Sequence, residues 1–275
     1  MELESYPEEQ CWFITLTYND ENIPWVEGQL QEYQPGFGVI SVDIEEQTLD
    51  KRDLQLFLKR LRKKFAKDYG AEKIRFFACG EYGGKGRPHY HVILFGLPLE
   101  KVGDLTPYAH SELGYYRQFS PTIEKIWGKG FVDIGKVTWE SAAYVARYTM
   151  KKATGGYAKD WSRKHIKEKE FIDMSRMPGI GRAYYEEHKE HLLEYDEAYV
   201  AKKDRAITVK MPKYFDRLFD VEYPERLEEL KEVRQKVAEA KLQDVKRKTN
   251  LTSQEIRDAQ ALELEARSKK LIRPL

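Results

Sequence analysis

The chain is poor in cysteine and contains no long apolar run. Its 275 residues include only two cysteines, Cys11 and Cys79, which give neither a disulfide framework nor a zinc-finger spacing. No stretch approaches the roughly 18 apolar residues of a membrane-spanning helix, and the acidic N-terminus is unlike a signal peptide. The G-x-x-x-x-G-K-[ST] loop is also absent, so no helicase motor is indicated. We therefore expect a protein of the reducing cytoplasm without a membrane partner.

Positive charge is missing from the first 50 residues. This segment contains twelve Asp and Glu and no Lys or Arg, although the whole chain has a net charge of +1. The remainder therefore carries +13, and residues 51–69 and 145–169 each hold eight basic and two acidic side chains. Basic patches of this kind fit contacts with a phosphate backbone, although either patch alone is more commonly a solvated helix face.

Five segments are predicted to be strands because they are rich in β-branched, aromatic or continuously apolar residues. They are residues 11–18, 37–44, 73–80, 89–96 and 130–137. The apolar run V-I-L-F within the fourth segment predicts that this strand lies inside a sheet. The stretches 22–38 and 97–120 are expected to be loops.

Helical spacing is clearest at 51–69, between a capping Asp50 and a terminating Gly70. Further helices are predicted at residues 121–127, 138–152, 182–203 and most of 224–270, interrupted near 249–250. Thr252 and Glu255 form a capping box for the last of them. We divide the chain into a core of residues 1–152, a mixed segment 153–222 packed on it, and a charged helical extension 223–275.

A glycine-rich loop separates two groups of metal-ligand side chains. Glu81 ends one predicted strand, and His89 and His91 begin the next in the sequence R-P-H-Y-H. Side chains alternate across a strand, so both histidines point to one face and Tyr90 to the other. If the two strands pair as a hairpin, Glu81 reaches the histidines and completes a three-ligand site for a divalent metal. Taken alone, H-x-H is more often a pair of ordinary half-buried histidines.

The segment 138–152 places two tyrosines, Tyr144 and Tyr148, on one helical face. On a helical wheel they lie beside Lys151, whereas Ala142 and Val145 belong to the opposite, small apolar side. The apolar side is expected to pack on the sheet, leaving the hydroxyls directed away from the core. Such a pair suits attack of a tyrosine oxygen on a phosphodiester, because a nearby cation favours the phenolate.

Three motifs in this order resemble those of replication initiators of the HUH endonuclease superfamily, of the kind encoded by small circular single-stranded DNA phages. They are F-I-T-L-T-Y (13–18), R-P-H-Y-H-V-I-L-F-G (87–96) with the upstream Glu81, and Y-V-A-R-Y-T-M-K (144–151). Two positions depart from the family pattern. Tyr90 replaces an aliphatic residue, and Arg147 stands where a lysine often follows the first tyrosine.

The resemblance implies an α+β fold, with an antiparallel sheet of about five strands, flanking helices and a helical C-terminal extension. It implies that Tyr144, Tyr148 and Lys151 are catalytic and that Glu81, His89 and His91 bind Mg²⁺ or Mn²⁺. It further suggests DNA contacts by the basic residues Lys85, Arg87, Arg147 and Lys152.

The implied activity is nicking of origin DNA, single-stranded at the cleavage site, to start rolling-circle replication in the cytoplasm of a bacterial host. A host helicase and polymerase are candidate partners. The C-terminal helices either brace the nuclease or recognise duplex DNA or a helicase. The alternative is a nucleic-acid-binding module of the same architecture without catalysis, in which Tyr82, Tyr90 and the basic helix contact bases and phosphates.

Overall fold

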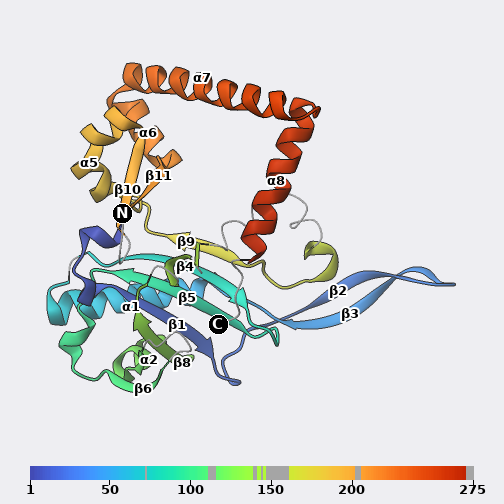
Figure 1. Cartoon of the computed structure of the whole chain (residues 1–275). Helices are drawn as coiled ribbons and strands as arrows, with labels where there is room; N and C mark the ends of the chain where they lie inside the picture. Colours follow the sequence, from blue (N-terminus) through green and yellow to red (C-terminus); the bar gives the residue numbers. More distant parts are fainter. Residues whose placement is uncertain are drawn as a thin grey trace. The chain divides into compact units, whose positions relative to one another are not determined.

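The computed structural model describes residues 1–71, 73–110, 116–138, 141–143, 145–146, 161–201 and 206–270. The chain divides into two compact units, Met1–Tyr184 and Tyr185–Leu275. Strands and helices occur in both, which confirms the α+β class (Figure 1). Of the helices in these described ranges, none combines the length and apolar composition needed to cross a bilayer.

The first unit is built on an antiparallel sheet that has seven strands in the described residues. Their spatial order is β6 (Thr106–His110), β7 (Tyr116–Phe119), β8 (Gly130–Lys136), β1 (Trp12–Tyr18), β5 (Pro88–Phe95), β4 (Arg75–Tyr82) and β9 (Phe171–Met174). The prediction of about five strands is therefore wrong in number. The metal-motif strand β5 lies between β1 and β4, as its apolar run predicts.

The additional strands lie toward the two edges of the sheet. β6 and β7 fall within residues 97–120, where the sequence predicts a loop, and β9 falls in a stretch without an assignment. All three are only four or five residues long, and β9 pairs with β4, which lies far from it in the sequence. Short edge strands carry little periodic signal of their own, because distant pairing stabilises them.

A second two-stranded sheet forms a long ribbon in the first unit. β2 (Trp25–Gln34) and β3 (Gly38–Gln47) pair residue by residue from Trp25↔Gln47 to Gln34↔Gly38, and the ribbon extends beyond the main sheet (Figure 1). The predicted loop at 22–38 is thus wrong, because Pro35 and Gly36 only form the turn between strands. The 37–44 strand is confirmed and is longer than predicted.

Helices α1 (Lys51–Tyr69) and α2 (Pro121–Trp127) cover one face of the main sheet. The Asp50 side chain accepts a hydrogen bond from the Arg52 N–H at 2.7 Å, and Gly70 adopts a left-handed conformation, so both predicted ends of α1 are confirmed. The apolar side of α1 packs against alternate residues of the strands. The fully buried members of this core include Trp12, Ile14, Leu16, Phe57, Phe65, Tyr90 and Trp127.

The opposite face of the sheet is covered at one end only by a smaller apolar cluster. Its buried residues are Cys11, Cys79, Ile93, Phe95 and Val145. Val145 comes from the predicted tyrosine helix, of which residues 141–143 and 145–146 are described as helical. Ala142 also packs against this cluster, which confirms the prediction that the small apolar side of the segment faces the sheet.

The second unit is largely helical and contains one short hairpin. Its elements are most of α5 (Arg182–Tyr195), β10 (Glu197–Ala201), β11 (Ala206–Lys210), α6 (Lys213–Glu222), α7 (Pro224–Lys248) and α8 (Ser253–Lys270). The helix predicted at 182–203 ends at Tyr195, because Asp196 has a φ of 56° and a strand follows.

The C-terminal extension is helical, as predicted. The Thr252 hydroxyl accepts from the Glu255 N–H at 3.3 Å and the Glu255 carboxylate accepts from the Thr252 N–H at 2.7 Å, which confirms the capping box. Along α7, Leu227 and Leu230 are buried, whereas Val233 and Val237 are exposed. The predicted stripe is therefore buried only in its first part.

Candidate metal centre

The candidate ligands come together through the pairing of two neighbouring strands. β4 and β5 form the predicted hairpin, in which Glu81 pairs with His89 and Cys79 pairs with His91. Because cross-strand partners share a face, Glu81 and His89 lie side by side, with His91 two residues along β5 on the same face. The period-two prediction is confirmed.

The three side chains converge on one carboxylate oxygen. Glu81 Oε1 lies 2.8 Å from His89 Nε2 and 2.7 Å from His91 Nε2. One ligand atom from each residue falls within 4.8 Å of the others, and Glu81 and His91 are buried while His89 is half-buried. Two imidazole nitrogens and a carboxylate oxygen are a suitable donor set for a divalent cation that keeps open positions for substrate oxygens.

The second nitrogen of each imidazole is already engaged. Nδ1 of His89 lies 3.1 Å from the backbone oxygen of Arg87, and Nδ1 of His91 lies 3.0 Å from the Thr15 hydroxyl. A carbonyl oxygen only accepts hydrogen bonds, so His89 Nδ1 carries a proton and a neutral ring offers the lone pair of Nε2. At 2.8 Å from a carboxylate, that lone pair requires either a second proton or a metal ion between the two atoms.

The protonation preferences within the cluster also suit a cation. Burial alone would raise the pKa of Glu81, but hydrogen bonds from His89 and His91, together with their charges, lower it to about 2. Burial lowers the pKa of His91, and this effect outweighs the opposing influence of the Glu81 hydrogen bond and charge. An ionised carboxylate beside a neutral imidazole is the state in which both groups coordinate metal.

Tyr90, between the two histidines, points into the helix-covered core. Its hydroxyl lies 2.7 Å from the Tyr18 hydroxyl, donates to the Asp50 carbonyl at 2.8 Å and accepts from the Asp50 N–H at 3.0 Å. Tyr18 in turn donates to Asp53 at 2.8 Å. A tyrosine at this position therefore ties the metal-ligand strand to the start of α1, which explains why a polar hydroxyl is accommodated there.

The two basic residues of the β4–β5 loop differ in their surroundings. Lys85 is exposed, which is compatible with its predicted DNA contact. Arg87 donates from Nη1 to the Tyr18 carbonyl at 2.6 Å and forms an ion pair with Asp20. Its guanidinium thus joins the loop to the end of β1, while its own carbonyl holds both His89 and the Gly83 N–H. The DNA contact of Arg87 stays a prediction, and the structure adds a positioning role.

The predicted catalytic pair lies outside the described residues. This holds for Tyr144, Tyr148, Lys151 and the predicted DNA contacts Arg147 and Lys152. The described part of the same segment packs on the face that carries the histidines: Val145 is fully buried in one cluster with Ile93 and Phe95 of β5. Phe13, packed against that cluster, stacks on the His91 ring at a centroid distance of 5.4 Å.

Comparison with known proteins gives a family. Residues 11–153 match the family model described as replication-associated protein ORF2. This stretch is just over half of the chain, and it includes the metal cluster and both candidate tyrosines. The chain belongs to this family.

Relatives come from several small viruses. The replication-associated protein ORF2 of Spiroplasma virus 4 is 36% identical over 245 residues, covering 88% of this chain and 68% of the relative. The corresponding values for the replication-associated protein VP4 of Bdellovibrio phage phiMH2K are 28%, 82% and 64%. The replication-associated protein ORF4 of Chlamydia phage 1 is 38% identical over 117 residues, 42% of this chain and 29% of the relative. No solved structure matches.

Sequence reasoning missed one member of the site of this replication-associated protein. Thr15 lies in the first motif, and its hydroxyl fixes His91, yet only the β1–β5 register Thr15↔His91 reveals the contact. The signal in the sequence is the alternation of F-I-T-L-T-Y, which puts Thr15 and Thr17 on the face opposite the apolar core.

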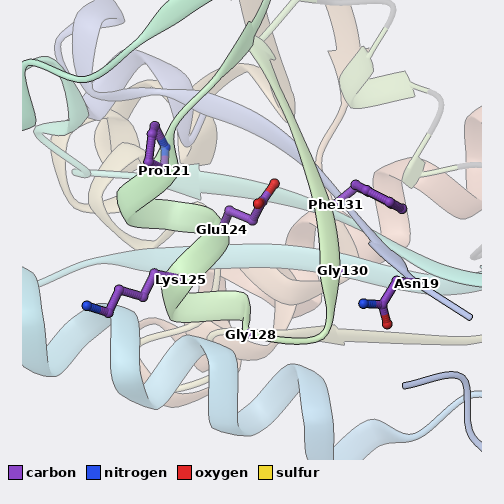
Figure 2. A pocket seen from close by; sticks show the side chains of 7 residues that line it. All are labelled: Asn19, Pro121, Glu124, Lys125, Gly128, Gly130 and Phe131. Atoms are coloured by element: carbon purple, nitrogen blue, oxygen red, sulfur yellow. The ribbon is translucent and has the colours of Figure 1, made fainter. Parts of the chain in front are cut away.

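A hollow of about 360 Å³ lies apart from the metal cluster, between α2 and the start of β8. Glu124 and Lys125 of α2 line it on one side, and Asn19, Gly130 and Phe131 line it on the other (Figure 2). Figure 2 shows Phe131 projecting from β8 on the side away from α2. This residue therefore belongs to the same sheet face as the histidines.

Proposed function

We propose that this replication-associated protein initiates rolling-circle replication by nicking one strand of the viral origin in the cytoplasm of the bacterial host. The supporting observation is the Glu81–His89–His91 cluster, whose Nε2 atoms and carboxylate face one point on the sheet. Membership in a family of replication-associated phage proteins gives this metal centre a DNA substrate. The tyrosine segment starts on the same face, through Val145.

In the proposed reaction, a tyrosine oxygen attacks the phosphorus of a DNA phosphodiester. The bond from phosphorus to the 3′ oxygen breaks, the tyrosine proton is lost to solvent, and the leaving 3′ oxygen takes up a proton. The products are a free 3′-OH, from which a polymerase extends, and a 5′-phosphotyrosine that preserves the bond for rejoining. Lys151 and Arg147 would favour the phenolate.

The metal ligands are Glu81, His89 and His91, and Mg²⁺ or Mn²⁺ is the proposed ion. When bound, such an ion supplies Lewis-acid polarisation of the scissile phosphate. Two nucleophiles allow a relay: one tyrosine makes the first cut, and the second attacks the regenerated junction after one round, so that the released strand is closed. We assign the first cut to Tyr148, because Lys151 follows it by three residues.

The test is incubation with single-stranded origin DNA and Mn²⁺, followed by denaturing electrophoresis. A covalent adduct is expected with the wild-type chain and a markedly weaker one with Glu81→Ala. The double variant Tyr144→Phe/Tyr148→Phe should form none. An adduct of wild-type yield in that double variant would refute the assignment of the nucleophiles.

A non-catalytic binding module is the second candidate, because exposed aromatic side chains on this sheet face would equally serve single-stranded DNA without cleavage. Metal binding separates the two. A binding module has no use for Glu81, His89 and His91 around one point, so calorimetry without detectable Mn²⁺ binding would favour it.

A further inference from the structure

The sheet face that carries the histidines is divided into a covered and an open half. On one side of His91, Phe13 and the Ile93–Phe95 cluster are packed under Val145. On the other side, β8 and β7 present polar and aromatic side chains of high exposure. The candidate metal centre lies at the border between these halves.

The strand register places an exposed phenylalanine in the same row as the metal ligands. Glu81 pairs with His89, His89 with Thr17, and Thr17 with Phe131. All four side chains share one face, and adjacent strands are about 4.8 Å apart, so Phe131 lies about 10 Å from His89 across the sheet. Phe131 is 63% exposed, whereas its neighbour Val132 is buried in the core below.

The next row ends in a fixed aromatic–cation pair. Asp133 lies opposite Thr15, which lies opposite His91. The Asp133 carboxylate accepts from the Tyr108 hydroxyl at 2.8 Å and from Nε of Arg117 at 2.8 Å. These bonds hold the Arg117 guanidinium 5.5 Å from the centre of the Tyr108 ring. Tyr108 remains 54% exposed, so the pair is ordered and still accessible.

We propose that Phe131 and the Tyr108–Arg117 pair form a stacking platform for the bases of single-stranded DNA. The strand would then cross β1 and β8 from the metal centre toward β7 and β6. This inference rests on the proposed function, and it assigns the substrate path to the sheet face in addition to the β4–β5 loop that carries Lys85.

The chemistry of the platform favours bases over phosphates. Asp133 neutralises Arg117, so this half of the face offers flat aromatic and guanidinium surfaces with little net positive charge. Every base has a π-face, and stacking on an aromatic side chain tolerates any sequence. In a duplex the bases are already stacked on one another, so the platform should select single strands.

The inference can be tested without the cleavage reaction. The probe is a fluorescein-labelled oligothymidylate in the absence of divalent metal, and fluorescence anisotropy reports its affinity for the full-length chain. Phe131→Ala should weaken binding by roughly ten-fold, within the range expected for the loss of one base–aromatic stack. Phe131→Leu should weaken it similarly, because it keeps an apolar side chain without a π-face, whereas Phe131→Tyr should bind like the wild type.

Phe37→Ala is the matched control, since Phe37 is 79% exposed at the turn of the β2–β3 ribbon. It should leave affinity unchanged. Affinity for a blunt duplex should be the same in all variants, and so should Mn²⁺ affinity, which also verifies folding.

The outcomes separate the platform from the proposed function. Unchanged oligothymidylate affinity in Phe131→Ala would overturn the platform even if the wild-type chain forms covalent adducts. Conversely, a wild-type chain that forms no adduct would refute nicking, while the anisotropy series would still measure the platform.

Discussion

At the metal centre, the contacts of the two Nδ1 atoms determine which nitrogen each imidazole offers to a cation. His91 depends on a side-chain hydroxyl, since its Nδ1 lies 3.0 Å from Thr15 Oγ1. We predict that Thr15→Val, which preserves shape and removes the hydroxyl, weakens Mn²⁺ binding by roughly 10- to 100-fold, as is usual for outer-shell partners. Isothermal titration calorimetry measures this directly. Thr17→Val is the control, because Thr17 pairs with His89, whose Nδ1 is held by a backbone oxygen. Equal affinities in both variants would contradict the assignment.

Arg87 is predicted to act on the metal site through the backbone. Because its guanidinium joins the loop to the Tyr18 carbonyl and to Asp20, both Arg87→Gln and Asp20→Asn should loosen the carbonyl that holds His89. We expect each to lower Mn²⁺ affinity by roughly ten-fold, the lower end of outer-shell effects. Lys85→Gln should instead weaken only DNA binding. If Asp20→Asn left Mn²⁺ affinity at the wild-type value, the positioning role of Arg87 would be wrong.

The Tyr90 hydroxyl is predicted to stabilise the fold. Tyr90→Phe leaves the Asp50 N–H and carbonyl without their buried partner. Such a loss costs roughly 1–3 kcal/mol of unfolding free energy. Urea denaturation gives the value, with Tyr33→Phe as the control, since Tyr33 is 75% exposed on the ribbon. A Tyr90→Phe variant as stable as the wild type would show that the hydroxyl network contributes nothing.

Residue patterns predict the metal ligands better than the groups that support them. Glu81, His89 and His91 follow from alternation within one local hairpin, which the structure confirms. Thr15 and Arg87 act through contacts between distant segments or through the backbone, and neither leaves a periodic signal. The exposure of Phe131 also depends on what covers the sheet, which no local pattern encodes.

At the scale of elements, the β2–β3 ribbon shows how composition misleads. Pro35, Gly36 and Gly38 predict a long loop, yet Pro35 and Gly36 form only the turn of a ten-pair hairpin. Gly28 lies inside a strand, where an added Cβ would lie 3.3 Å from Ile166. α1 was predictable because its caps and its apolar face lie within one continuous segment.

The ribbon is predicted to be dispensable for cleavage. Val26 pairs with Glu46, so residues 27–45 can be replaced by Asn-Gly, which closes a two-residue hairpin. Glu46, which receives hydrogen bonds from His165 and the Ile166 N–H, is retained. Adduct formation and Mn²⁺ affinity should be unchanged. The deletion removes four acidic side chains and no basic ones, so affinity for oligothymidylate should rise at low salt. Loss of adduct formation would instead place the ribbon in the substrate path.

For the whole molecule, the net charge of +1 conceals an acidic first segment and a remainder of +13. Phosphate contacts release counterions, so binding to single-stranded DNA should weaken steeply with salt in spite of the near-neutral total. The basic outer side of α1 belongs to the first unit, as does the metal centre. The residues needed for single-strand chemistry thus fall within one compact unit.

A chain ending at Tyr184 is therefore predicted to keep that chemistry. The first unit, Met1–Tyr184, contains the metal cluster, the platform and both candidate tyrosines. The truncated chain should bind Mn²⁺ and form adducts with single-stranded origin DNA within a few-fold of the full-length chain. Denaturing electrophoresis on matched single-stranded and supercoiled substrates gives the comparison. If adducts disappear on both and circular dichroism shows unfolding, the second unit braces the first. If cleavage is lost on supercoiled DNA alone, Tyr185–Leu275 serves recognition of duplex DNA, because single-strand chemistry then proceeds without it.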